Sequence, residues 1–377
     1  MISFGALVRK ALKLDPLVLI FAVGIALFGI HAIDLGMSET TPRPLAAIQW
    51  NYFLLGTAVM IGVGCVPYSR WVALGPLAWG ALLVLLIGVA VAGTTVNGSR
   101  RWLSLGGFQF QPSEPMKTAL ILVLAKCLDR GEPVRTVGRW LPLLLFAVVP
   151  FGLVVRQPDL GTALMYVPIA LAVLFVAGLP LRVVGSMFAA GIVLAFAAFR
   201  WFLHPYQRER IISTFFRENL ADYEKAREGF QLLQSLRAVG LGGMRGNPDP
   251  EGTLSGSGAL PESYNDFVFA TVSENYGFVG ASLLLAALLC LVLACFRVGF
   301  VCRDPAGKVI CTGVGTLFAV QTLVNAGVAL GVVPTTGIAL PLVSSGGSAL
   351  VAMMAALGLV LSVSVHPSSP LTRGSME

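Results

Sequence analysis

Uninterrupted apolar stretches of about twenty residues recur along this chain, and they constrain its fold more than any other feature. The first is 17-LVLIFAVGIALFGIHAI-33. Of the 377 residues, 56% are hydrophobic and only 12% are charged, against about 25% charged residues in a soluble domain. Inside a bilayer, the backbone N–H and C=O groups of such stretches must pair internally, which forces them into helices. The sequence therefore predicts an all-α polytopic membrane protein.

We expect about ten transmembrane helices in a single domain that covers residues 1–377. A long loop over residues 204–266 separates the seventh and eighth helices and contains an amphipathic helix near 219–237, which one interpretation places on the membrane surface. The Gly-rich segment 238–258 is expected to be flexible. The ten helices are expected at 16–34, 48–66, 71–93, 113–128, 140–156, 162–178, 182–203, 267–296, 309–330 and 347–365.

The distribution of basic residues predicts that both termini are cytoplasmic. The short loops on the side of the N-terminus are rich in Lys and Arg, for example 126–139 and 297–308, whereas the short loops on the other side hold few. An excess of Lys and Arg in short loops marks the cytoplasmic side of a membrane protein. The long loop 204–266 is then extracytoplasmic.

The sequence argues against nucleic-acid binding and against a protein-built metal site. The net charge of +7 is explained by the cytoplasmic loops, and no basic stripe with interleaved aromatic residues occurs. The six cysteines show no CxxC spacing and the three histidines lie far apart, so we expect no metal ligands among them. The serine cluster 344-SSGGSAL-350 is expected to start a helix and not to supply a nucleophile.

Four of the 19 carboxylates fall at the extracytoplasmic edges of apolar segments: Glu114, Asp159, Asp266 and Glu274. A charge at such a depth is costly and is by default a functional hypothesis. Structural explanations stand beside it, because Glu114 would complement a helix dipole and both Asp159 and Asp266 would serve as N-caps. Glu274 follows Asp266 by two helical turns, so we expect both on one helix face.

Basic residues on the same side complete a candidate site for an anion. Arg101, Lys117 and Arg210 are the candidates to bind phosphate, which guanidinium groups hold in bidentate fashion. Carboxylates and cations together in a membrane cavity suit a phosphate-bearing lipid, and they would equally suit a proton-coupled transporter.

Seven sequence blocks occur in an order that resembles the SEDS family (shape, elongation, division and sporulation), from residue 15 to residue 365. The chain is most similar to RodA, the elongation member, and FtsW, the division member, is the close alternative. The blocks are NGSRRW (97–102), QPSE (111–114), RQPDLGTAL (156–164), PYQRERI (205–211), GFQLLQSLRAVGLGG (229–243), LPESYNDFVFA (260–270) and VVPTTGIALPLVSSGGS (332–348).

The resemblance implies a peptidoglycan glycosyltransferase with ten transmembrane helices in the bacterial inner membrane. It implies polymerisation of lipid II, an undecaprenyl-pyrophosphate-linked substrate, at the extracytoplasmic face, together with a class B penicillin-binding protein and the elongation machinery. The essential aspartate of the family matches Asp266, and further important positions match Arg101, Glu114, Lys117 and Asp159. A lipid II flippase and a non-catalytic scaffold are the alternatives.

The expected reaction is an inverting transfer with Asp266 as general base, because inversion needs one base and no covalent intermediate. Arg101, Lys117 and Arg210 would hold the pyrophosphate, with Glu114, Asp159 and Glu274 around them. A divalent cation such as Mg²⁺ or Mn²⁺ is an optional helper, and no organic cofactor is expected.

The chain departs from the usual pattern of the family in four places. HTDFIF reads YNDFVF, which puts Asn265 before the aspartate, and GEE reads SEN, which puts Asn275 after Glu274. QPSEF reads QPSEP, with Pro115 in the first turn of a helix, and SYGGS reads SSGGS. These changes leave Asp266 itself intact.

Overall fold

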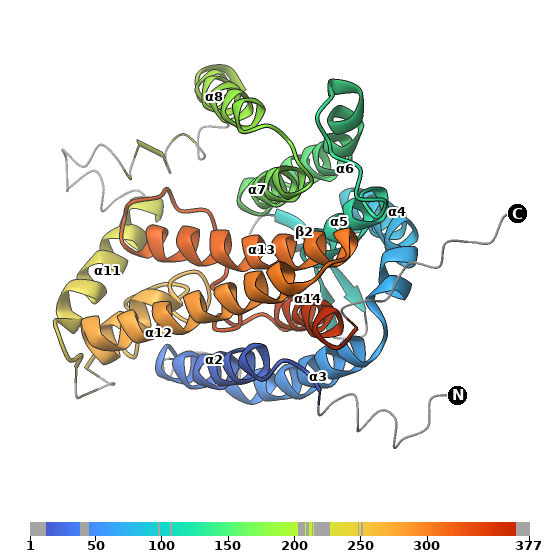
Figure 1. Cartoon of the computed structure of the whole chain (residues 1–377). Coiled ribbons are helices and arrows are strands. Elements are labelled where there is room, and N and C mark those ends of the chain that lie inside the picture. Colours follow the sequence, from blue (N-terminus) through green and yellow to red (C-terminus); the bar gives the residue numbers. More distant parts are fainter. Residues whose placement is uncertain are drawn as a thin grey trace, which may run out of the picture.

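The structure, a computed structural model, describes residues 13–37, 45–96, 99–105, 108–202, 208, 211–212, 214, 227–247, 249 and 252–366. It is a bundle of helices with one small antiparallel sheet (Figure 1). The elements are α2 (Pro16–Leu35), α3 (Leu45–Cys65), α4 (Tyr68–Ala92), β1 (Thr94–Val96), β2 (Ser99–Leu105), β3 (Phe108–Phe110), α5 (Ser113–Cys127), α6 (Val137–Arg156), α7 (Leu160–Val176), α8 (Leu181–Ala197), the π-helix η1 (Ala198–Phe202), α11 (Arg227–Gly242), α12 (Val268–Val301), α13 (Pro305–Ala329) and α14 (Gly347–Val365).

Each of the ten segments expected to be a transmembrane helix forms a helix. Among the described residues, eight helices are long and apolar enough to cross a membrane, with α8 counted together with η1. The other two are α7, a shorter apolar helix of 17 residues, and α5, which has 15. The protein is therefore a multi-pass membrane protein.

The helices differ strongly in burial, which separates the interior of the bundle from its lipid-facing surface. Most side chains of α5 are buried, and α13 and α14 are the most deeply buried of the long helices. In contrast, α8 stands at the edge of the bundle (Figure 1), and its apolar side chains, such as Phe188 and Ile192, are exposed. Outward-facing apolar side chains are expected where lipid is the solvent.

Two sets of polar contacts bring several helix ends together at one end of the bundle. None of the predicted site residues that the structure describes lies at this end. Asp15 caps α2 through the backbone N–H groups of its first turn and pairs with Arg297 of α12. Asp304 caps α13 and accepts a hydrogen bond of 3.0 Å from the Tyr68 hydroxyl at the start of α4. The starts of α2, α4 and α13 and the end of α12 therefore lie together. The starts of α5, α7 and α14 lie at the opposite end.

The polar segment after α4 folds as a sheet of three strands in the order β1-β2-β3. Thr94 faces Trp102 in the first pair of strands, and Leu103 faces Phe110 in the second. This sheet was not expected from the sequence. The sheet places β2, and with it Arg101, beside α4 and the start of α5.

The helix expected near 219–237 is α11, which extends to Gly242 and packs on α12 and α13. The first residues of the expected range, 219–226, lie outside the described residues. The prediction of a flexible segment after it was wrong for residues 238–247. A Cβ atom at Gly242 would lie 1.9 Å from the Ser273 carbonyl oxygen, and one at Gly246 would lie 2.1 Å from that of Asn275. These glycines let the backbone dock directly on α12.

The docked backbone fills a break in α12. Gly277 has non-helical backbone angles with a φ of +66°, a conformation that only glycine adopts at low cost. The Phe278 N–H donates to the Gly243 carbonyl oxygen at 2.8 Å, so the segment after α11 satisfies groups that the broken helix leaves open. The short helical piece before the break, which starts at Val268, is held in place from outside.

We predict that Gly242→Ala destabilises the protein by about 1–3 kcal/mol, because the new methyl group forces the α11 backbone away from Ser273. Thermal unfolding in detergent measures the effect. Gly240→Ala is the matched control on the same helix, since nothing lies within 4 Å of its Cβ position. Equal unfolding temperatures for the two variants would contradict the close packing described here.

Candidate active site

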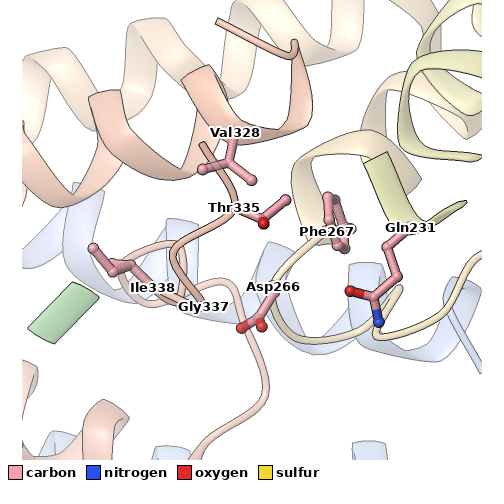
Figure 2. A pocket seen from close by; sticks show the side chains of 7 residues that line it. All are labelled: Gln231, Asp266, Phe267, Val328, Thr335, Gly337 and Ile338. Carbon is pink, nitrogen blue, oxygen red and sulfur yellow. The ribbon is translucent and has the colours of Figure 1, made fainter. Parts of the chain in front are cut away.

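Asp266 lies in the loop immediately before α12 and lines a small cavity (Figure 2). The N-cap of α12 is Phe267, which makes no side-chain capping bond, so the N-cap explanation of Asp266 was wrong. The cavity has a volume of about 30 Å³, enough for about two water molecules. Its other lining residues are Gln231 of α11, Phe267, Val328 of α13, Thr335, Gly337 and Ile338.

The position of Asp266 is set through its backbone. The Asn325 side-chain amide of α13 donates to the Asp266 carbonyl oxygen at 2.9 Å and to the Ile338 carbonyl oxygen at 2.8 Å. One buried carboxamide therefore ties the loop before α12 to the loop 334–340. Gly337 has a φ of +70°, and its Cβ position lies 3.5 Å from the Asp266 Oδ2 atom. A side chain at residue 337 would be strained by this positive φ, and its Cβ atom would be in van der Waals contact with the carboxylate.

The serine cluster stabilises the same two loops. The Ser344 hydroxyl donates to the Asn265 carbonyl oxygen at 2.7 Å and accepts from the Leu340 N–H at 2.8 Å. The Ser345 N–H donates to the Tyr264 carbonyl oxygen. Burial, together with the Glu262 carboxylate, raises the pKa of the Tyr264 phenol, which therefore stays protonated at neutral pH. Ser344 is thus committed to backbone groups, in agreement with its predicted structural role.

Arg101 and Asp159 form the first of two charge pairs near the start of α7. Arg101 Nη1 lies 3.6 Å from Asp159 Oδ2, and its Nη2 donates to the Pro158 carbonyl oxygen. The same Asp159 oxygen accepts from the Gln111 amide at 3.3 Å, while Oδ1 caps α7 through the Thr162 N–H. The predicted N-cap is confirmed, and Asp159 orients Arg101 as well.

Glu114 and Lys117 form the second pair, inside the bundle. Lys117 Nζ lies 2.8 Å and 2.9 Å from the two Glu114 oxygens, and the side chains are only 2% and 9% exposed. Glu114 lies in the first turn of α5, as expected. The hydroxyl of Tyr166 in α7 donates to the Ser113 carbonyl oxygen at 3.1 Å, which joins α7 to this turn.

One loop connects the charge pairs to Asp266. Gly161, two residues after Asp159, has its Cβ position 2.4 Å from the Thr336 carbonyl oxygen. The next residue of that loop, Gly337, is the one beside Asp266. The start of α7, which Asp159 caps, and the Asp266 carboxylate therefore both contact the loop at residues 336–337.

Glu274 does not join this group. It is fully buried, and its carboxylate accepts hydrogen bonds from the Leu254 N–H at 2.6 Å, the Ser255 N–H at 3.0 Å and the Ser255 hydroxyl at 2.8 Å. The argument that it shares a helix face with Asp266 was wrong, because Asp266 precedes α12 and is not part of the helix. In this structure Glu274 anchors the turn 252–258.

Two of the departures noted in the sequence have structural explanations. The Asn275 amide donates to the Ser255 hydroxyl oxygen at 3.3 Å and to the Thr271 carbonyl oxygen at 2.9 Å, so it stabilises the turn that Glu274 anchors. Pro115 occupies the first turn of α5, where the backbone N–H has no acceptor within the helix. The lost N–H therefore costs little.

Several candidates cannot join the site on the evidence of the described residues. Arg210 lies outside them, as does the side chain of Arg100. Arg208 is half-buried and donates to the Arg200 carbonyl oxygen at 3.0 Å. The described part of the chain contains no group of three or more His, Cys, Asp or Glu side chains that would hold a metal ion.

Sequence reasoning missed Gln231, Asn325 and Thr335. A signal was present for Asn325, because an amide within an apolar segment as long as 309–330 needs hydrogen-bond partners there. Gln231 and Thr335 lie within two of the sequence blocks noted above, but nothing in those blocks singled out either side chain. Their role follows from the contact of α11 with the loop after α13.

Comparisons with known proteins identify the family of the chain. Residues 13–369 match the family of FtsW, RodA and SpoVE, described as "Cell cycle protein". The chain belongs to this SEDS family.

Among its SEDS relatives, peptidoglycan glycosyltransferase MrdB of Escherichia coli K12 is 33% identical over 94% of both chains. A probable peptidoglycan glycosyltransferase FtsW of Geobacter metallireducens is 32% identical over 97% of this chain and 98% of its own. A solved structure titled for the coordination of polymerization and crosslinking by a peptidoglycan synthase complex superposes with a TM-score of 0.80 at 32% identity, over 94% of this chain and 99% of that chain. The rod shape determining protein RodA of Thermus thermophilus gives 0.68 at 29% identity, over 94% and 98%.

We predict that Lys117→Met destabilises the protein by about 3–5 kcal/mol, because it leaves the Glu114 carboxylate buried without a counter-charge. The double variant Lys117→Met/Glu114→Gln should recover most of the loss. Chemical unfolding in detergent measures both. Similar stability of the single variant and the wild type would show that the pair is not buried as described.

We predict that Glu274→Gln loosens the turn 252–258, because an amide NH₂ group replaces one of two oxygens that accept backbone hydrogen bonds. Hydrogen exchange should become faster at Leu254 and Ser255 and stay unchanged in α13. Unchanged exchange in the turn, combined with weaker lipid II binding, would favour a substrate contact over an anchor.

Proposed function

We propose that this protein polymerises lipid II into glycan strands by inverting glycosyl transfer, with Asp266 as the general base. One observation carries the proposal: Asp266 lines a cavity at the end of the bundle where four further functional candidates lie, and its backbone carbonyl group is held by Asn325 of α13. The names of the relatives support the same chemistry, since MrdB and FtsW are peptidoglycan glycosyltransferases.

In this reaction Asp266 takes the proton from the 4-hydroxyl of the acceptor N-acetylglucosamine. The oxygen attacks the anomeric carbon of the donor, the bond to the pyrophosphate breaks, and undecaprenyl pyrophosphate leaves. The α-linked phosphate is thereby converted into a β-1,4 glycosidic bond. The base and the stabilisation of charge on the leaving group are the two contributions that the protein must supply.

Arg101 is the cation best placed for the pyrophosphate, because it is 25% exposed while its partner Asp159 is 3% exposed. A phosphate would compete with the Asp159 carboxylate for the guanidinium group. Lys117 is almost wholly buried against Glu114, so a direct contact with the substrate requires that the pair open. We assign Glu114 and Asp159 to orienting these cations, and Arg210 stays a candidate ligand.

A divalent cation is part of the proposal only as a helper for the leaving group. Mg²⁺ is commonly held by one or two carboxylates together with the phosphates of a substrate. The described part of the chain contains no group of three or more His, Cys, Asp or Glu side chains that could hold a metal ion. The substrate would therefore supply most of the ligands.

The cavity must enlarge when substrate binds. Pockets for compounds of this size enclose several hundred Å³, whereas the cavity beside Asp266 measures about 30 Å³. Its walls come from α11, the end of α13 and the loop 334–340. Entry of the sugars therefore requires that α11 and this loop separate.

We place the active site on the extracytoplasmic face. The site lies at the end of the bundle opposite the contacts Asp15–Arg297 and Tyr68–Asp304. That other end carries the loops rich in Lys and Arg, which mark the cytoplasmic side. Cytoplasmic termini follow from the same argument.

We further propose a class B penicillin-binding protein as the partner and cell elongation as the setting. The similar structure with a TM-score of 0.80 comes from work on a synthase complex that coordinates polymerization with crosslinking. Both MrdB and FtsW are similar to this chain, so a septal role is the alternative.

We predict that Asp266→Asn abolishes glycan polymerisation and leaves folding and partner binding intact, because the amide has the same shape but cannot accept the proton. Polymer formation from purified lipid II in detergent measures the activity. Detergent also separates polymerisation from lipid transport, which requires a two-sided membrane.

Asp249→Asn is the control, since it changes an exposed carboxylate of the same loop and should keep wild-type activity. A wild-type rate of polymerisation for Asp266→Asn would contradict the assignment of Asp266 as the base. Absence of polymer from the wild-type protein, in the presence of its partner, would sink the proposed function.

A further inference from the structure

The Gln231 side chain of α11 reaches the same cavity as Asp266. Figure 2 shows its carboxamide turned towards the space beside the Asp266 carboxylate. No hydrogen bond joins this carboxamide to another residue in the described part of the chain. The Gln231 side chain is partly exposed, so its amide is accessible from the cavity. The site therefore presents a donor and an acceptor that are available to a ligand.

The direction of Gln231 is fixed by the way α11 docks. Ser235 lies one turn further along the same helix face, and its hydroxyl donates to the Ala329 carbonyl oxygen at 3.0 Å. Val328, next to Ala329, lines the cavity. At the end of α11, Gly242 lies directly against the backbone of α12. The helix is held at two points, so Gln231 is presented to the cavity by a rigid element.

The hydrogen-bonding groups of Gln231 and Asp266 together favour a particular kind of ligand. The Gln231 amide nitrogen donates two hydrogen bonds and its oxygen accepts, while a carboxylate only accepts. A sugar hydroxyl both donates and accepts, so neighbouring hydroxyl groups can bond to the carboxamide and the carboxylate at the same time. Val328, Phe267 and Ile338 contribute apolar surface to the wall, and Thr335 and Gly337 complete it. Convergent polar groups beside apolar surface are typical of sites that fix the orientation of a ligand.

We propose that Gln231 binds the acceptor sugar of lipid II, by hydrogen bonds to its hydroxyl groups, and so turns the reacting hydroxyl towards Asp266. This inference rests on the proposed function, because it needs a sugar acceptor at Asp266. It assigns the residue that positions the acceptor, and it gives α11 a direct part in the reaction.

The experiment uses the full-length protein purified with its class B penicillin-binding protein and compares Gln231→Ala and Gln231→Glu with the wild type. Gln231→Glu keeps the shape of the side chain and replaces the NH₂ donor by an acceptor. We expect both variants to lower kcat/KM for lipid II polymerisation at least about tenfold, the effect of a lost hydrogen bond to the substrate. Thermal unfolding verifies that each variant is folded.

A binding measurement separates substrate contact from an indirect effect. In the inactive Asp266→Asn background, Gln231→Ala should weaken the affinity for purified lipid II several-fold. Gly240→Ala, on the same helix with open space around it, should leave rate and affinity unchanged. Unchanged lipid II affinity in the Gln231 variants would overturn the inference. A wild-type complex that makes no polymer would instead overturn the proposed function, whatever the Gln231 variants do.

Discussion

The double hydrogen bond from Asn325 to two backbone carbonyl groups is the interaction on which the candidate site depends. The loops that carry Asp266 and Ile338 have irregular backbone at the end of a membrane bundle. Irregular backbone near lipid is stable only where protein groups satisfy its N–H and C=O groups. Asn325 does this from α13, and Ser344 does it from the loop before α14. The two side chains thus fix Asp266 through the main chain.

The two charge pairs show how the same bundle tolerates ions at different depths. Lys117 and Glu114 are both buried and neutralise each other within one helical turn. Breaking such a pair costs more than it contributes, because the remaining charge is left without water or partner. Arg101 is more exposed and has a longer contact with Asp159. An incoming phosphate can therefore compete for Arg101 with a smaller loss, which divides the basic residues into a structural pair and a candidate ligand.

Glycine contacts link the long loop between the seventh and eighth membrane helices to the site. Gly242 and Gly246 permit the chain after α11 to dock on the backbone of α12 near its break at Gly277. Glu274 and Asn275 then hold the turn 252–258 on the short helical piece that follows Asp266. Because α11, the broken helix and the Asp266 loop are connected by these contacts, a movement of α11 would change the shape of the cavity.

The sequence by itself determined the ten helices and their order, because hydrophobic length is a local property that the bilayer converts directly into helix. It also placed Glu114 in a first turn and Asp159 at an N-cap, since both depend on residues within one turn. Only the tertiary structure decided that Asp266 faces a cavity, that Glu274 anchors a turn and that Gln231 reaches the site. Those outcomes depend on loops from distant parts of the chain meeting at one end of the bundle, and such contacts are set by packing and backbone satisfaction rather than by any local pattern.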